Sequence, residues 1–138
     1  TWDRKKMFQA VWSGDTKILT EEISKLLIKT ISYHDYKEDF YHAFLAGIFA
    51  GGGHRVESNR EHGEGRSDVI VFDKMNARLA IFEVKCVKKL DNLPEACEAA
   101  LEQIEDRRYA ESFWDNYNEK LRYGIAFYKK RCLVGRKA

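Results

Sequence analysis

Helical periodicity dominates the first third of the chain. Residues 2–12 predict a short helix. A longer helix should follow, because apolar residues recur at positions 18, 19, 23, 26, 27 and 31. A third helix should begin near Asp35, which precedes Glu38 by three positions in the spacing of a capping box, and should end at residues 51–53, which are all glycine. We therefore expect three helices ahead of the first strand.

The pattern then changes to that of β-strands. Residues 54–60 alternate weakly, whereas residues 67–73 and 78–87 are nearly continuous apolar runs. Strands that are apolar on both faces are usually covered on both faces. A helix with Pro94 in its first turn should run to about Glu111, and it is followed by strands at 121–130 and 132–135. This order predicts an α/β fold in which helices flank a mixed central sheet.

Composition narrows the class of protein without identifying it. The chain has 138 residues, of which 44% are hydrophobic and 33% charged, which is typical of one globular domain spanning residues 1–138. A net charge of +2 neither requires nor opposes a nucleic-acid partner. We expect no membrane partner, because no apolar run approaches the roughly 20 residues of a membrane span. Three cysteines without CxxC spacing predict neither disulfides nor zinc, and they favour a cytoplasmic location.

Three charged residues interrupt the apolar runs at 67–73 and 78–87. A turn centred between residues 75 and 76 places Asp68 directly opposite Glu83 in an antiparallel hairpin, and Lys85 points to the same face as Glu83. Like charges in this arrangement destabilise a hairpin, so the carboxylate pair needs a compensating positive charge. A divalent cation that prefers oxygen ligands, Mg²⁺ or Mn²⁺, would supply it. The alternative is that Lys85 alone neutralises the pair.

An Asp, a hairpin and a following Glu-Val-Lys resemble the PD-(D/E)xK nuclease superfamily, although Ser67 stands where the proline of that signature would be. The resemblance implies a restriction-endonuclease-like core of α-β-β-β-α-β order over residues 35–134, preceded by a helical extension at residues 1–34. More narrowly, four segments resemble a nuclease-like module found C-terminal to AAA-type ATPase domains in many bacterial proteins: EDFYHAFLAGIF, NREHGEGRSD, IFEVK and ALEQIEDRRY. This narrower likeness implies an ATPase domain as a partner, in the same or a longer chain.

The resemblance also implies an activity and a role for each residue of the motif. Asp68, Glu83 and the backbone carbonyl of Val84 would bind Mg²⁺ or Mn²⁺. Lys85 would orient or activate the attacking water and stabilise charge on the phosphate. The implied function is metal-dependent hydrolysis of phosphodiester bonds, with DNA as the expected substrate. The alternative is a non-catalytic module on the same fold that binds nucleic acid or protein and serves an ATPase domain.

Further residues are secondary candidates. Glu38 stands where related enzymes place a helix carboxylate beside the metal, and its alternative role is the capping box. Gln103 resembles the helix glutamine of the exonuclease branch, and it borders the apolar face of its helix. A polar residue there needs a partner, which the active site would provide. Glu57 would lie opposite Asp68 if the loop after residue 60 were centred on residues 62–63, and otherwise it is a solvated side chain.

Basic residues flank both predicted strands of the hairpin. Arg60 and Arg66 precede the strand of Asp68, and Lys88 follows the strand of Lys85. On the predicted register Arg66 lies opposite Lys85, so a phosphate that approaches the metal would meet it. These residues are candidates for contacts with the nucleic-acid backbone, and their alternative role is simple solvation.

Overall fold

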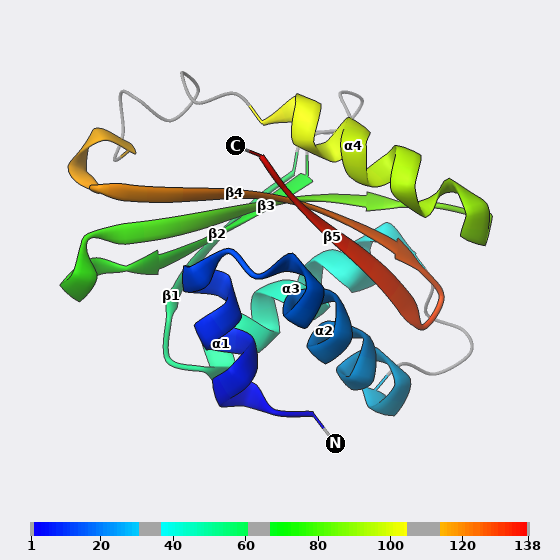
Figure 1. Cartoon of the computed structure of the whole chain (residues 1–138), viewed down its shortest axis with the longest axis horizontal. Coiled ribbons are helices and arrows are strands. Elements are labelled where there is room, and N and C mark those ends of the chain that lie inside the picture. The colour runs from blue at the N-terminus through cyan, green and yellow to red at the C-terminus, as the bar shows by residue number, and fades with distance from the viewer. Residues whose placement is uncertain (1, 31–36, 61–66, 105–113, 138) are drawn as a thin grey trace.

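The computed structural model describes residues 2–30, 37–60, 67–104 and 114–137. Its centre is a five-stranded sheet in the order β1-β2-β3-β4-β5 (Figure 1). The strands are β1 (Arg55–Arg60), β2 (Ser67–Asp73), β3 (Arg78–Cys86), β4 (Glu119–Tyr128) and β5 (Arg131–Lys137). β3 and β4 run parallel, and the other neighbours are antiparallel. The prediction of a mixed sheet is therefore confirmed.

Helices cover both faces of this sheet. On one face lie α1 (Arg4–Ser13), α2 (Thr16–Thr30) and α3 (Glu38–Gly51), and on the other lies α4 (Leu93–Gln103) (Figure 1). Short 3-10 turns, η1 (Lys74–Asn76), η2 (Leu90–Asn92) and η4 (Trp114–Asn116), connect the larger elements. No helix within the described ranges is long and apolar enough to cross a membrane.

Two apolar layers result from the alternation of side chains along the central strands. On the side of α1, α2 and α3, Val69 and Phe82 are fully buried with residues of those helices. On the side of α4, Ile70 and Ile81 pack with Leu101. This confirms that the central strands are covered on both faces. Successive side chains of the hairpin therefore point alternately to the side of α1, α2 and α3 and to the side of α4.

Helix α3 begins differently from the prediction. Its N-cap is Lys37, which makes no side-chain capping bond, so the expected capping box is wrong; Asp35 itself lies outside the described residues. Glu38 instead occupies the first turn, where a carboxylate interacts favourably with the helix dipole. The end of α3 agrees with the prediction, since Gly51 is its last residue and Gly52 its C-cap.

Helix α4 is shorter than predicted but lies very close to the sheet. It ends at Gln103, because Ile104 has an extended backbone with φ −74° and ψ 116°, so the prediction of one helix to Glu111 is wrong. Residues 105–113 lie outside the described part. A Cβ atom at Gly124 on β4 would be 2.7 Å from the carbonyl oxygen of Cys97 on α4. Glycine at this position is what allows α4 to approach β4 so closely.

Candidate active site

The carboxylate pair has the geometry that the sequence predicts. Asp68 on β2 is paired directly with Glu83 on β3. The turn between these strands, residues 74–77, has the four-residue length that gives this register. Asp68 is 1% exposed and Glu83 is 2% exposed, although both are carboxylates. Burial of two acidic groups in one pair is costly unless cations or hydrogen-bond donors face them.

Both carboxylates point to the α4 side of the sheet. Their neighbours Ile70 and Ile81, two residues along the same strands, pack with Leu101 of α4. Because side chains alternate along a strand, Asp68 and Glu83 share the face of Ile70 and Ile81. Lys85 is half-buried and lies two residues beyond Glu83, so it is on this face as well. The structure thus brings together the three residues of the sequence motif.

Hydrogen bonds from Asn59 and Ser67, within the described part of the chain, orient the carboxylates. The side-chain amide of Asn59, the residue paired with Asp68 on β1, donates to Oδ1 of Asp68 at 2.8 Å. The backbone N–H of Ser67 donates to Oε2 of Glu83 at 3.1 Å. These bonds hold one oxygen of each carboxylate in a fixed direction, which is what a preorganised metal site needs.

Asn59 is a site residue that the sequence reasoning missed. The register of β1 against β2 places Glu57 opposite Ile70 and Asn59 opposite Asp68. The conditional pairing of Glu57 with Asp68 is therefore excluded, and Glu57 is instead a partly exposed side chain that lies 3.5 Å from Arg55, in line with the alternative of a solvated glutamate. The sequence contained one indication of this role. The segment NREHGEGRSD begins with Asn59, whose side-chain amide can donate to a carboxylate.

His42 of α3 supports Asp68 from the opposite face. Its Nε2 lies 3.0 Å from the backbone carbonyl oxygen of Asp68. A carbonyl only accepts hydrogen bonds, so Nε2 carries the proton and donates it. Nδ1 then accepts from the hydroxyl of Ser58, which is 3.4 Å away. The histidine is buried and connects α3, β1 and β2 at the point where Asp68 enters the site.

The two secondary candidates, Gln103 and Glu38, lie in different environments. Gln103 ends α4, and its Oε1 is buried without a hydrogen-bond partner among the described residues. A buried acceptor left unpaired costs about 1–3 kcal/mol, so this oxygen needs a donor or a cation. Glu38 is exposed at the start of α3. Across the described ranges, no three His, Cys, Asp or Glu residues are grouped as metal ligands are, so Glu38 is not clustered with Asp68 and Glu83 in this structure.

The donor set nevertheless fits Mg²⁺ or Mn²⁺. Asp68 and Glu83 supply carboxylate oxygens from adjacent strands, and the residue after Glu83 is Val84, whose side chain is in the opposite core. Mg²⁺ is commonly held by one or two carboxylates, with waters and substrate phosphate completing its shell. Two carboxylates are therefore enough for such an ion.

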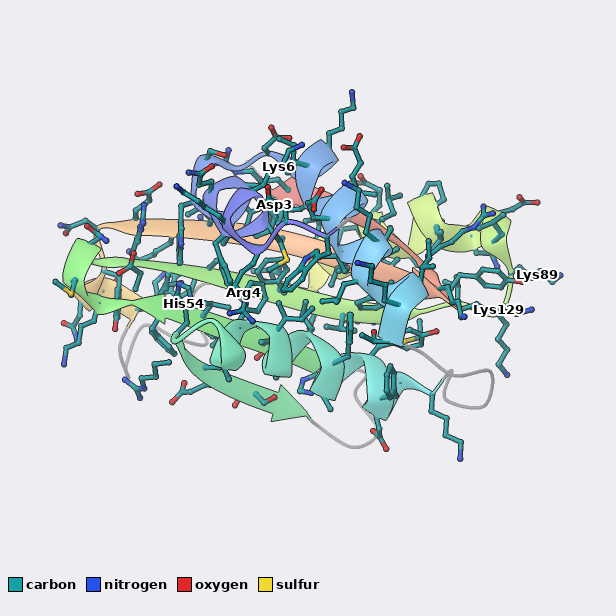
Figure 2. All side chains as sticks on the ribbon, turned by 90° about the horizontal axis from the view of Figure 1, so that it is seen from below. Asp3, Arg4, Lys6, His54, Lys89 and Lys129 are labelled. Atoms are coloured by element: carbon teal, nitrogen blue, oxygen red, sulfur yellow. The ribbon has the colours of Figure 1, made fainter. Side chains whose placement is uncertain are left out.

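A group of cations lies beyond the ends of the parallel strands β3 and β4. We call it the basic end, and it consists of Lys88, Lys89, Lys129, Lys130 and Arg131. A backbone hydrogen bond of 2.9 Å from Val87 to Phe127 joins the two segments that carry these residues. Figure 2 shows Lys89 and Lys129 together at one end of the molecule. The same end of β3 carries Lys85, so the basic end is adjacent to the candidate site.

Of the predicted phosphate-binding residues, the structure fully describes only Lys88. Lys88 is exposed and belongs to the basic end. Arg60 is the last residue of β1, and its side chain is not described. Arg66 lies outside the described residues. Sequence reasoning missed residues 129–131, because only the parallel pairing of β3 with β4 brings them beside Lys88.

Comparison with known protein families identifies the family of this chain. The model of a family described as the PD-(D/E)XK nuclease superfamily matches residues 36–137. This range includes the carboxylate pair, Lys85 and all five strands. No curated protein and no solved structure matches the chain.

Proposed function

Because this chain belongs to the PD-(D/E)XK nuclease superfamily, whose members generally hydrolyse phosphodiester bonds, we propose that it is a metal-dependent nuclease that acts on DNA. The observation that carries the proposal is the buried pairing of Asp68 with Glu83, with Lys85 on the same face. The mixed sheet covered by helices on both faces is the restriction-endonuclease-like fold of this superfamily.

Asp68, Glu83 and the backbone carbonyl of Val84 would hold Mg²⁺ or Mn²⁺. When bound, the cation acts as a Lewis acid on a phosphate oxygen and lowers the pKa of a coordinated water. Asn59 and the backbone N–H of Ser67 keep the two carboxylates oriented towards the cation. Burial strengthens each of these electrostatic interactions, because the effective dielectric constant is lower than in bulk water.

Lys85 has a different task, since an ammonium cannot bind a cation. It would lie beside the phosphate and stabilise the negative charge that develops as water attacks. Gln103 would offer its Oε1, which has no hydrogen-bond partner among the described residues, to the attacking water or to the metal-bound shell, and we assign it a supporting role. Glu38 remains a candidate only through contacts with substrate at the margin of the site, because it is not grouped with the carboxylate pair.

The basic end would hold the nucleic-acid backbone. Cations contact phosphates without reading sequence, and they fix the strand relative to the reactive groups. Lys88 and the turn at residues 129–131 would bind phosphates on one side of Lys85. Arg60 and Arg66 precede Asp68 in the chain and would serve on the β2 side.

Cleavage assays test the proposal. Plasmid DNA, linear DNA and RNA are incubated with the protein, with and without Mg²⁺ or Mn²⁺. Cleavage of DNA should require the metal and should be abolished by Asp68→Asn. Lys85→Ala should lower the rate by about 10²–10³ and leave metal binding intact, whereas Lys74→Ala, at the far end of the hairpin, should have the wild-type rate. If Lys85→Ala cleaves as fast as wild type, its assigned role is wrong.

The same assays separate the nuclease from its alternative. A non-catalytic module that serves an AAA-type ATPase domain would bind nucleic acid or the ATPase but would cleave nothing with either metal. Binding to DNA in Ca²⁺ without cleavage in Mg²⁺ or Mn²⁺ would therefore favour the accessory module over the enzyme.

A further inference from the structure

A second site candidate lies on the face of the sheet opposite the carboxylate pair. It is a cavity of about 620 Å³ between α1, the segment before β1 and the start of β3. Its walls include Arg4, Lys5, Phe8, Trp12, His54 and Arg78. Figure 2 shows Arg4, on α1, close to His54, which precedes β1. A volume of this size is typical of pockets that bind small organic ligands.

The cavity is separate from the candidate active site. Arg78 begins β3, and Glu83 is five residues further along the same strand, which corresponds to about 17 Å. The side chain of Arg78 packs against Trp12 of α1, whereas Glu83 points to the α4 side. A ligand in this cavity would therefore touch none of the residues that we assign to metal binding or hydrolysis.

Positive charge distinguishes this cavity from an ordinary apolar groove. Arg4, Lys5 and Arg78 line it, and no Asp or Glu is among the described residues of its wall. Arg4 and Lys5 are exposed and available to a ligand. Arg78 is held in place by a salt bridge of 2.7 Å from its Nε to Oδ2 of Asp73, and this carboxylate offsets its charge. Arg4 and Lys5 therefore supply the positive charge that would attract an anion to the cavity, whereas Arg78 shapes its wall.

The aromatic walls are fixed as well. The rings of Phe8 and His54 are stacked, with centroids 4.7 Å apart and an interplanar angle of 25°. The guanidinium of Arg78 lies over the ring of Trp12, 4.6 Å from its centroid. Each of these contacts occupies one face of a ring, so a flat ligand would pack against the parts of Phe8 and Trp12 that line the cavity. Little conformational entropy would be lost, because the rings are already held in place.

One wall also contains an unsatisfied polar atom. Nδ1 of His54 is buried and has no hydrogen-bond partner in the part of the chain that the structure describes. Buried polar atoms normally have a partner, and their exceptions need an explanation. Because His54 lines the cavity, a ligand with a hydrogen-bonding group is a candidate partner for this nitrogen.

We propose that this cavity binds a nucleotide unit, with its base against the aromatic wall of Phe8 and Trp12 and its phosphate against Arg4 and Lys5. Aromatic rings beside cations form the combination that holds unpaired nucleotides. The nucleotide could be a free mononucleotide or an unpaired nucleotide of a strand. In the second case the inference rests on the proposed function, because the strand would be a substrate.

Binding measurements on the catalytically disabled Asp68→Asn protein test this inference, so that no ligand is cleaved. The probes are AMP, TMP and a single-stranded oligonucleotide, followed by calorimetry and by tryptophan fluorescence. The variant Arg4→Gln/Lys5→Gln changes only exposed side chains and should weaken binding at least tenfold. The matched control is Lys17→Gln, an exposed cation on α2 that does not line the cavity, and it should bind as the parent does.

Two further readouts locate the ligand and identify its source. Quenching of fluorescence by the bound nucleotide should largely disappear in Trp12→Phe while calorimetric binding remains. Binding of mononucleotides identifies a free nucleotide, and binding of the oligonucleotide alone identifies an unpaired strand. The inference is overturned if no probe binds, or if Arg4→Gln/Lys5→Gln binds like Lys17→Gln. Neither result affects the nuclease proposal, which is judged by metal-dependent cleavage of duplex DNA.

Discussion

Replacement of Asp68 by asparagine should abolish stabilisation of the fold by Mg²⁺ or Mn²⁺. A ligand that binds only the native state stabilises it by RT ln(1 + [L]/Kd), which is about 2.7 kcal/mol at a hundredfold excess over Kd. For a chain of this length that free energy corresponds to a rise in Tm of roughly 10 °C. Asp68→Asn removes one of the two charged ligands, so the rise should be lost or strongly reduced.

The substitution should leave the fold intact and stabilise the metal-free protein. Carboxylates opposite each other at about 5 Å repel by roughly 3 kcal/mol at an effective dielectric constant of 20, and Lys85 offsets part of this repulsion. Asparagine retains an Oδ1 that can accept from Asn59, and the bond from His42 is made to the backbone carbonyl. We therefore expect the metal-free variant to melt at or above the temperature of metal-free wild type.

Thermal melts followed by circular dichroism, with and without Mg²⁺ or Mn²⁺ at constant ionic strength, provide the assay. The control is Asp115→Asn, which removes an exposed carboxylate from η4 and should keep the full metal-induced rise. An equal rise in wild type and Asp68→Asn would falsify the assignment of Asp68 as a metal ligand. A metal-free variant that melts well below wild type would instead refute the argument that the paired carboxylates repel.

Three further predictions test the surface, the pH dependence and the packing. Lys88→Gln should reduce the slope of log DNA affinity against log salt concentration, measured in Ca²⁺, by about 0.7–0.9. The control Lys74→Gln should leave this slope unchanged, and an unchanged slope in Lys88→Gln would mean that Lys88 is only solvated. Burial raises the pKa of Glu22, but hydrogen bonds from Lys25 and a backbone N–H outweigh burial and lower it below the ordinary value of 4.5. Glu22→Gln should therefore cost about 1–2 kcal/mol in urea unfolding near neutral pH, and the difference should shrink as the pH falls below 4.5; a difference that persists in acid would contradict this. Gly124→Ala should cost about 1–3 kcal/mol by forcing α4 away from β4, and an unchanged urea midpoint would show that the helix shifts freely.

Sequence alone determined the features that depend on neighbours along the chain. Alternation within residues 67–73 and 78–86 fixed which side chains share a face, and a short turn fixed the pairing of Asp68 with Glu83. Because both faces of these strands are apolar and buried, the length of the turn, rather than the hydrophobic pattern, sets this register. The glycines at 51–53 likewise marked the end of α3, because a helix end is a local property.

Tertiary structure decided the features that join segments distant in the chain. The longer connection between β1 and β2 left their register open in sequence, and the folded sheet placed Asn59 opposite Asp68. The parallel pairing of β3 with β4 assembled the basic end, although its two halves are about forty residues apart. The second cavity forms where α1 packs near Arg78, at the start of β3, and His54, just before β1. Such contacts between distant segments cannot be predicted from the periodicity of one segment, because they depend on how whole helices and strands pack against one another.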